Sequence, residues 1–205
     1  MSDGLIFYWF AWIGCIIVTF FMPEGKRRSF LTSYILILIL LANFQLTIGG
    51  FTFSLSFAAL LMMSFCLSAR LPKTAFHLIV SFIVMLGYTA IHIWYFSSPL
   101  QFFLPQLATQ SLIPFLLAIL LAKGFWNRLV SCLSGMVGGE WLYSFILASY
   151  SFPDVIGDMR FLDSTVIFVA VLICQSLLSA GKRKLKELVN RAVLKPRSFV
   201  KKKAQ

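Results

Sequence analysis

The sequence predicts an all-α integral membrane protein with seven transmembrane helices, an outside N-terminus, a cytoplasmic C-terminus and a C-terminal amphipathic interfacial helix. Of its 205 residues, 60% are hydrophobic and only 12% are charged, whereas soluble domains carry about 25% charged residues. A soluble fold must still present a wet surface, so lipid as the solvent explains this composition better than a large core does. Seven apolar segments and a one-sided distribution of basic residues complete the prediction.

Each apolar segment approaches the length of about 20 residues that a helix needs to cross the hydrocarbon core. The segments are continuously apolar, whereas the strands of a membrane barrel alternate in polarity, so helices are favoured. They form a bundle over residues 1–180 and leave no room for a soluble domain. In chain order, the predicted spans are 5–22, 30–48, 51–69, 74–96, 107–122, 129–150 and 164–180.

The boundaries of these spans have local signals. No basic residue precedes the first segment, which argues against a cleaved signal peptide and for a retained span. Gly49-Gly50 predicts a tight reversal between the second and third spans, because glycine tolerates the backbone angles of a turn. The fifth span is short and contains Pro114, which neighbouring helices can accommodate. A polar loop over 151–163 is expected before the seventh span.

The positive charges predict the orientation. With the N-terminus outside, the inner loops are 23–29, 70–73 and 123–128, and together with the tail they contain every Lys and Arg except Arg160. Cytoplasmic loops of membrane proteins carry this excess. If the fifth segment were a re-entrant loop, the later basic groups would all lie outside, so seven spans are favoured over six or fewer. The net charge of +11 therefore indicates membrane orientation, and no nucleic-acid partner is expected.

The tail over 181–205 contains an amphipathic pattern. Leu185, Leu188, Val189 and two later apolar residues recur at helical spacing, which predicts a helix over 182–195 that ends before Pro196 and lies on the inner leaflet. Each basic residue near an anionic membrane surface contributes about 1 kcal/mol. A disordered polybasic tail is the alternative. The expected lipid-surface contacts are Lys182, Arg183, Lys184, Lys186, Arg191 and Lys195.

Glu140 lies midway along the sixth predicted span. A charged side chain at the bilayer centre costs at least about 2.5 kcal/mol, so such residues usually face the bundle interior or a water-filled cavity. The functional interpretation is a proton or cation site. The structural alternatives are a protonated carboxyl that donates a hydrogen bond to a neighbouring helix, and a position beside a cavity with no role in transport.

Ser131, Gly135 and Gly139 recur every four residues just before Glu140. This stripe of small residues lets two helix backbones approach closely. Packing within the chain is favoured over homodimerisation through this face, and the close contact is a sensible place for a partner of Glu140.

His92 lies near the outer end of the fourth span, with Tyr88 and Tyr95 on the same helical face. It is a candidate for pH sensing or ligand contact, and an interfacial histidine in an aromatic belt is the structural alternative. Its depth differs from that of Glu140 by about 9 Å at 1.5 Å per residue, so no direct pairing is expected.

The remaining reactive groups predict no chemistry. The four cysteines each fall inside an apolar segment without metal or disulfide spacing, so they are interpreted as packing residues. No nucleotide, protease or hydrolase motif occurs. We therefore predict no catalytic residue, no metal and no cofactor.

Three motifs carry a resemblance to a known family: Tyr8-Trp9, Pro23-Glu24-Gly25-Lys26, and the run from Ser134 to Glu140 that reads SGMVGGE. The chain resembles the YphA-like membrane proteins of spore-forming Gram-positive bacteria over essentially its whole length. The resemblance implies an uncharacterised multi-pass protein of the bacterial cell membrane, and it implies no activity.

Three functions are compatible with these observations. The first is a non-catalytic scaffold or accessory subunit of a membrane assembly, which asks least of the residues present. The second is a small transporter or ion or proton permeation protein that uses Glu140. The third is an intramembrane enzyme on a lipid substrate, which lacks a catalytic set. The expected partners are the lipid bilayer and anionic inner-leaflet lipids, with another membrane protein or a second copy of the chain left open.

Overall fold

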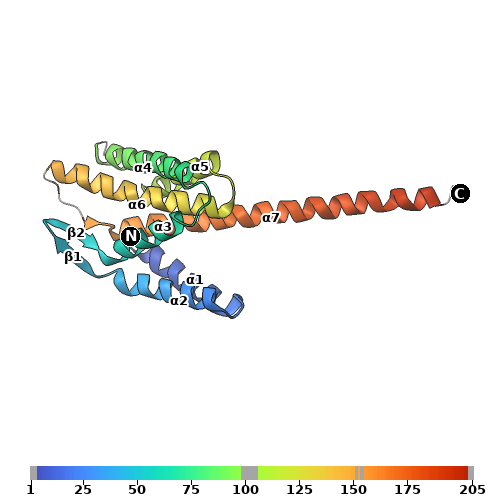
Figure 1. Cartoon of the computed structure of the whole chain (residues 1–205), viewed down its shortest axis with the longest axis horizontal. Coiled ribbons are helices and arrows are strands. Elements are labelled where there is room, and N and C mark those ends of the chain that lie inside the picture. The colour runs from blue at the N-terminus through green and yellow to red at the C-terminus, as the bar shows by residue number, and fades with distance from the viewer. Residues whose placement is uncertain (1–3, 98–105, 151, 153–154, 203–205) are drawn as a thin grey trace. The chain divides into compact units, whose positions relative to one another are not determined.

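The computed structural model of the chain describes residues 4–97, 106–150, 152 and 155–202, with side chains as far as residue 190. Within these ranges the chain is mostly helical, and its seven helices follow the order of the seven predicted segments (Figure 1). The chain divides into two units, residues 1–169 and residues 170–205. The helices are α1 Leu5–Phe21, α2 Lys26–Leu41, α3 Leu55–Ser68, α4 Thr74–Ser97, α5 Gln106–Leu121, α6 Phe125–Ser149 and α7 Met159–Lys202.

Three of these helices are long and apolar enough to cross a membrane, judged by length and composition over the described residues: α4, α6 and residues 159–190 of α7. The shorter apolar helices are α1, α3 and α5. Large apolar side chains of α1, α4 and α5 are exposed, such as Phe20, Trp94 and Leu120, with exposed fractions of 78%, 70% and 79%. Lipid is the environment that favours such a surface, since soluble proteins rarely expose large contiguous apolar patches.

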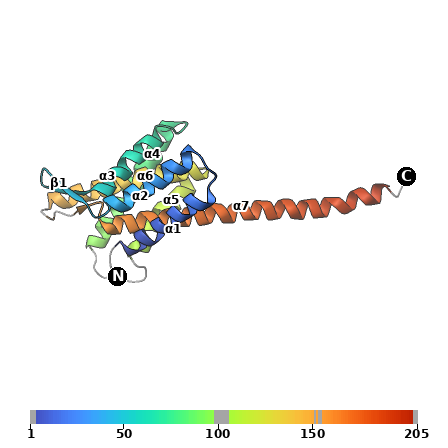
Figure 2. The same ribbon diagram turned by 90° about the horizontal axis from the view of Figure 1, so that it is seen from below.

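A β-hairpin between α2 and α3 corrects the prediction that the second and third spans are helical throughout. Strand β1 (Gln45–Ile48) pairs antiparallel with β2 (Phe51–Ser54), and Figure 2 shows β1 beyond the end of α2. The predicted reversal at Gly49-Gly50 is confirmed, with φ of 59° and 89° at the two glycines. These positive angles suit a two-residue hairpin turn.

The hairpin forms because its residues favour strands more than the apolar run suggested. Thr47, Ile48, Phe51, Thr52 and Phe53 are β-branched or aromatic and flank a glycine pair, which is the composition of a hairpin. A short apolar run cannot be assigned to helix or strand by periodicity alone. As a result α2 and α3 contain only 16 and 14 residues, and the fold is not purely helical.

A third strand joins the hairpin to the beginning of α7. Strand β3 (Val155–Ile156) pairs parallel with β2, with Thr52 opposite Val155 and Phe53 opposite Ile156. Gly157 then turns the chain with a φ of +75°, and a Cβ at this position would overlap the Phe57 side chain. The glycine therefore allows both the turn and the close approach to α3.

Helix α7 corrects three boundaries. It begins at Met159, so Asp163 lies in a helix rather than in the predicted loop, and it continues through Gly181 and beyond Pro196 to Lys202. A glycine within a helix costs about 1 kcal/mol but keeps its N–H group. Proline removes one hydrogen bond but fixes φ near the helical value. The predicted separate helix over 182–195 is thus part of one continuous helix.

One end of the first unit gathers segments that lie far apart in the sequence, and we call it the hairpin end. The Asp163 carboxylate accepts hydrogen bonds from the Gly4 and Phe7 amides at 2.9 and 2.6 Å, which joins the N-terminal turns of α1 and α7. The Phe51 ring of β2 stacks on Phe145 of α6, with ring centroids 5.8 Å apart. The hairpin, the start of α1, the start of α7 and the last turns of α6 therefore lie together.

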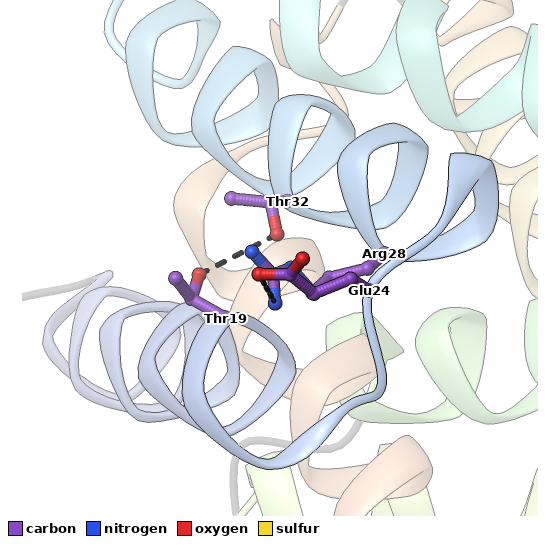
Figure 3. A network of polar contacts seen from close by, with 4 residues as sticks. All are labelled: Thr19, Glu24, Arg28 and Thr32. Carbon is purple, nitrogen blue, oxygen red and sulfur yellow. Dashed lines mark hydrogen bonds and ion pairs between the residues drawn. The ribbon is translucent and has the colours of Figure 1, made fainter.

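The connection between α1 and α2 is a short turn, which lies at the ends of these two helices that are remote from the hairpin end. Glu24 and Arg28 form an ion pair at 3.6 Å, and the hydroxyls of Thr19 and Thr32 lie 3.5 Å apart across the two helices (Figure 3). Exposed ion pairs contribute little stability. These contacts instead align α1 and α2 as neighbours.

Candidate functional site

The candidate site is built on the contact between α4 and α6, which lie side by side (Figure 1). The two helices run parallel, since successive residues of α6 meet successive residues of α4. His77 Nδ1 of α4 lies 3.0 Å from Ser131 Oγ of α6. Further along the same pair of helices, Thr89 Oγ1 donates to the Gly139 carbonyl at 3.0 Å.

The small-residue stripe faces α4, in agreement with the prediction of packing within the chain. A Cβ at Gly135 would lie 2.6 Å from Val84 Cβ and 2.7 Å from the Ser81 carbonyl oxygen. A Cβ at Gly139 would lie 2.8 Å from Tyr88 Cδ1. Real side chains do not approach so closely, so glycine is required at both positions. The α4 helix covers this face, so it is not available to a second copy of the chain.

Glu140 is buried beside this close contact, with 6% of its surface exposed. The Tyr88 hydroxyl donates a hydrogen bond to Glu140 Oε2 at 3.4 Å. Tyr88 is itself fully buried, and the Ser164 side chain of α7 is a further hydrogen-bonding neighbour of its hydroxyl. Tyr88 is therefore one partner of Glu140 at the close helix contact, and the sequence had indicated this tyrosine only as a neighbour of His92.

His92 joins the same group through aromatic contacts. Its ring centroid lies 4.4 Å from that of Tyr88 and 4.8 Å from that of Tyr143. The residue is 9% exposed, and its Nε2 atom has no hydrogen-bond partner among the described residues. We refer to Tyr88, His92, Glu140 and Tyr143 as the Glu140 cluster. Tyr95 lies outside it, because its hydroxyl is 2.6 Å from Thr109 Oγ1 of α5.

The structure thus places His92 and Glu140 in one cluster without a direct hydrogen bond between them among the interactions described. No direct pairing was predicted, from the difference in their depth. Tyr88, one turn before His92 in α4, reaches Glu140 across the parallel helix pair. A Tyr at position i−4 from a buried His, beside a predicted close contact, is the signal that could have indicated the cluster.

Asp163 is a structural carboxylate that the sequence analysis missed. It is 3% exposed and caps the first turn of α1, where helix amides lack partners within the helix. Nearby, Ser111 Oγ of α5 donates to the Ser164 carbonyl at 3.0 Å. These contacts stabilise the hairpin end of the bundle and leave the Glu140 cluster as the candidate site.

Two neutral polar residues of the second predicted span line a small surface pocket. Asn43 and Gln45 border a hollow of about 210 Å³ together with Ser54, Asp158 and their neighbours. The hairpin carries this part of the chain out of the helix, so they lie at the hairpin end instead.

Within the part of the chain that the structure describes, the cysteines and the start of the basic tail make no contact that suggests chemistry. All four cysteines are free, and the Cys132 thiol donates weakly to the Pro114 carbonyl at 3.6 Å. Among the described residues, no group of three or more His, Cys, Asp or Glu side chains could hold a metal ion. Of the predicted lipid contacts, those from Lys182 to Lys186 are exposed, whereas the side chains of Arg191 and Lys195 lie outside the described residues.

Comparison with known proteins agrees with the sequence resemblance. The model of the YphA-like integral membrane protein family matches residues 3–198. The uncharacterised protein YphA of Bacillus subtilis (strain 168) is 27% identical over 167 residues, which cover 79% of this chain and 81% of that protein. No solved structure matches the chain.

Proposed function

This chain belongs to the YphA-like integral membrane protein family, and from that premise we propose that it is a non-catalytic scaffold or accessory subunit of a membrane assembly. The observation that supports this proposal best is the continuation of α7 as a helix beyond its apolar part. At 1.5 Å per residue, a bilayer needs only about 20 residues of helix, whereas α7 has 44. Its second half is therefore long enough to bind a partner outside the membrane.

The proposal includes seven crossings with the hairpin end outside. The segments gathered at that end are those that the charge pattern assigns to the outside. Strands β2 and β3 lead into α3 and α7, and they are parallel, which agrees with the proposal that α3 and α7 both cross from the outside to the inside. The parallel α4 and α6 pair is also consistent, since two helices separated by one further crossing point the same way. The basic residues of α2 begin at Lys26, at the end remote from the hairpin.

The proposed binding surface is the extension of α7 over 181–190. Every residue in it is exposed. Leu185, Leu188 and Val189 form an apolar stripe and are 63%, 63% and 53% exposed. Lys182, Arg183, Lys184 and Lys186 surround this stripe with positive charge. By complementarity, the partner is a protein segment with an acidic surface and its own apolar stripe.

Crosslinking followed by pull-down from native membranes tests this function. We expect one protein to co-purify with the wild-type chain and to be lost in the double variant Leu185→Ala/Leu188→Ala. The matched control is Glu187→Ala/Asn190→Ala, which changes the opposite face of the same helix and should retain the partner.

Three outcomes would contradict the proposal. They are a solitary monomer in native extracts, a partner bound equally by both double variants, and capture of anionic lipid alone. The last outcome would assign the basic residues to lipid binding.

A further inference from the structure

We propose that one water molecule is bound inside the bundle between α5 and α7, where it bridges Gln110 and Thr165. The inference is independent of the scaffold function, because it concerns the interior of the bundle rather than the extension of α7. It starts from two buried polar side chains, each with an oxygen atom that no described residue contacts by a hydrogen bond. The proline inside α5 supports it further.

Gln110 of α5 and Thr165 of α7 are buried polar residues, with exposed fractions of 1% and 5%. Gln110 Oε1 and Thr165 Oγ1 have no hydrogen-bond partner among the described residues. Buried polar atoms in proteins are nearly always hydrogen-bonded, to protein groups or to ordered water, because an unpaired one is costly. Two such atoms on neighbouring helices therefore indicate a bound molecule that can hydrogen-bond to both.

A hydrogen bond between their chain neighbours shows where α5 and α7 meet. Ser111 Oγ of α5 donates to the Ser164 carbonyl of α7 at 3.0 Å. Helix α7 begins at the hairpin end. Helix α5 begins beside the last turn of α4, where the Tyr95 hydroxyl lies 2.6 Å from Thr109 Oγ1, and α4 ends at the hairpin end because it is parallel to α6. The helices α5 and α7 therefore run in the same direction.

This parallel arrangement places Gln110 and Thr165 on the same side of the contact. Successive residues of an α-helix are rotated by about 100° in one sense. Gln110 comes one residue before Ser111, whereas Thr165 comes one residue after Ser164. On two parallel helices that face each other, these opposite steps turn both side chains toward the same side, at depths that differ by about 3 Å. Polar groups that are near each other without a direct bond are the usual setting for a bridging water.

Pro114 provides a third acceptor for the same water. It has no N–H group, so it cannot donate to the Gln110 carbonyl four residues earlier, which is the bond that an α-helix forms there. Helix α5 nevertheless continues through Pro114 to Leu121. Ordered water is one of the groups that satisfy the backbone carbonyls freed by proline in transmembrane helices.

One water molecule matches these three groups in number and polarity. Its two hydrogens donate to Gln110 Oε1 and to the Gln110 carbonyl, and its oxygen accepts the Thr165 hydroxyl. Buried waters in proteins form about three hydrogen bonds of this kind. The neighbouring hydroxyls of Ser111 and Ser164 already donate to backbone carbonyls, which leaves the water to Gln110 and Thr165.

Water fits this position better than a metal cation does. The three proposed ligand atoms are neutral oxygens, whereas magnesium and calcium take about six oxygen ligands that include carboxylates. Asp163 lies two residues before Thr165, but its carboxylate accepts hydrogen bonds from the Gly4 and Phe7 amides. An unpaired cation in the bilayer interior would also be costly.

Nuclear magnetic resonance of the full chain in detergent micelles detects the water directly. With ¹³C-labelled threonine methyl groups, we expect a nuclear Overhauser cross-peak between water and the Thr165 methyl group. Thr89 is the matched control within the same sample. It is 4% exposed, but its hydroxyl donates to the Met85 and Gly139 carbonyls, so its methyl group should give no such cross-peak.

The variant Gln110→Met tests which residue holds the water, because it removes the carboxamide with little change in side-chain shape. The cross-peak at Thr165 should disappear in this variant. Absence of the cross-peak in the wild type would overturn the proposal, as would a cross-peak at Thr165 that persists in Gln110→Met.

The stability of Thr165→Val provides an independent test, since valine replaces the hydroxyl with a methyl group of similar size. If the hydroxyl binds the water, the folding equilibrium constant should fall about five- to tenfold, because the water and Gln110 lose a partner. If the hydroxyl is instead buried without any partner, valine removes that cost and the constant should rise, which would overturn the proposal. A fall without a water cross-peak in the wild type would also overturn it, since it would indicate a direct bond from Thr165 to Gln110.

Discussion

Replacing Gly135 with alanine adds one methyl group where α4 and α6 are closest. That carbon would lie 2.6 Å from Val84 Cβ and 2.7 Å from the Ser81 carbonyl oxygen. Carbon atoms in contact are normally about 3.5–4.0 Å apart, so the two helices must separate by about 1 Å. The backbone oxygen cannot move away alone. The strain therefore extends along the contact to the Tyr88–Glu140 hydrogen bond.

The expected loss of stability combines two opposing effects. Overpacking a close-packed contact costs about 1–3 kcal/mol, and replacing a mid-helix glycine with alanine returns up to about 1 kcal/mol. We expect a net decrease on the order of 1–2 kcal/mol in the free energy of unfolding. Denaturation followed by circular dichroism in detergent micelles measures it.

Gly138→Ala is the matched control, because it changes the same residue type in the same helix. Its Cβ would lie 3.1 Å from the sulfur of Met85, and methionine is flexible enough to move aside. This variant should be at least as stable as the wild type. If Gly135→Ala proves as stable as Gly138→Ala, the close approach of α4 and α6 is refuted.

Two further predictions concern the hairpin end. Asp163→Ala should lower the free energy of unfolding by about 1–3 kcal/mol, because two buried amides of α1 lose their acceptor. Amide hydrogen exchange in the first turn of α1 should then become faster. Unchanged exchange there would contradict the cap. Gly157→Ala should prevent normal folding, measured as loss of monodisperse protein, because it combines a φ of +75° with an overlap on Phe57. Gly49→Ala has a φ of +59° but open space around it, so it should cost only about 1 kcal/mol; equal yields of the two variants would contradict this account.

The membrane character and the order of the helices could be predicted from the sequence, because both depend on long apolar runs and on glycine or proline between them. The stripe from Ser131 to Gly139 likewise predicted a close helix contact, since only small residues permit it. The two strands of the hairpin were not predicted, although the reversal between them was. Residues 45–54 are apolar enough to continue a span, and the β-branched and aromatic side chains around the glycine pair favour strands there, as does the pairing of β2 with β3 about 100 residues later.

The candidate site was predicted in part. Glu140 stood out because an acidic residue within a span is costly, and His92 stood out as a titratable group. Their connection depends on the parallel alignment of α4 and α6, which brings Tyr88 against Glu140, and no local pattern encodes that alignment. Asp163 was assigned to a loop because charged residues usually end a span, whereas here the charge is compensated by the amides of α1.

Cysteine labelling in intact and permeabilised cells tests the proposed topology most directly. In a variant without the four native cysteines, one cysteine is placed at Gly49 in the hairpin turn, at Lys123 between α5 and α6, or at Lys184 in the extension of α7. The account predicts that a membrane-impermeant maleimide labels position 49 in intact cells. It also predicts that positions 123 and 184 are labelled only after permeabilisation. Labelling of position 123 or 184 in intact cells, with position 49 protected, would contradict the account.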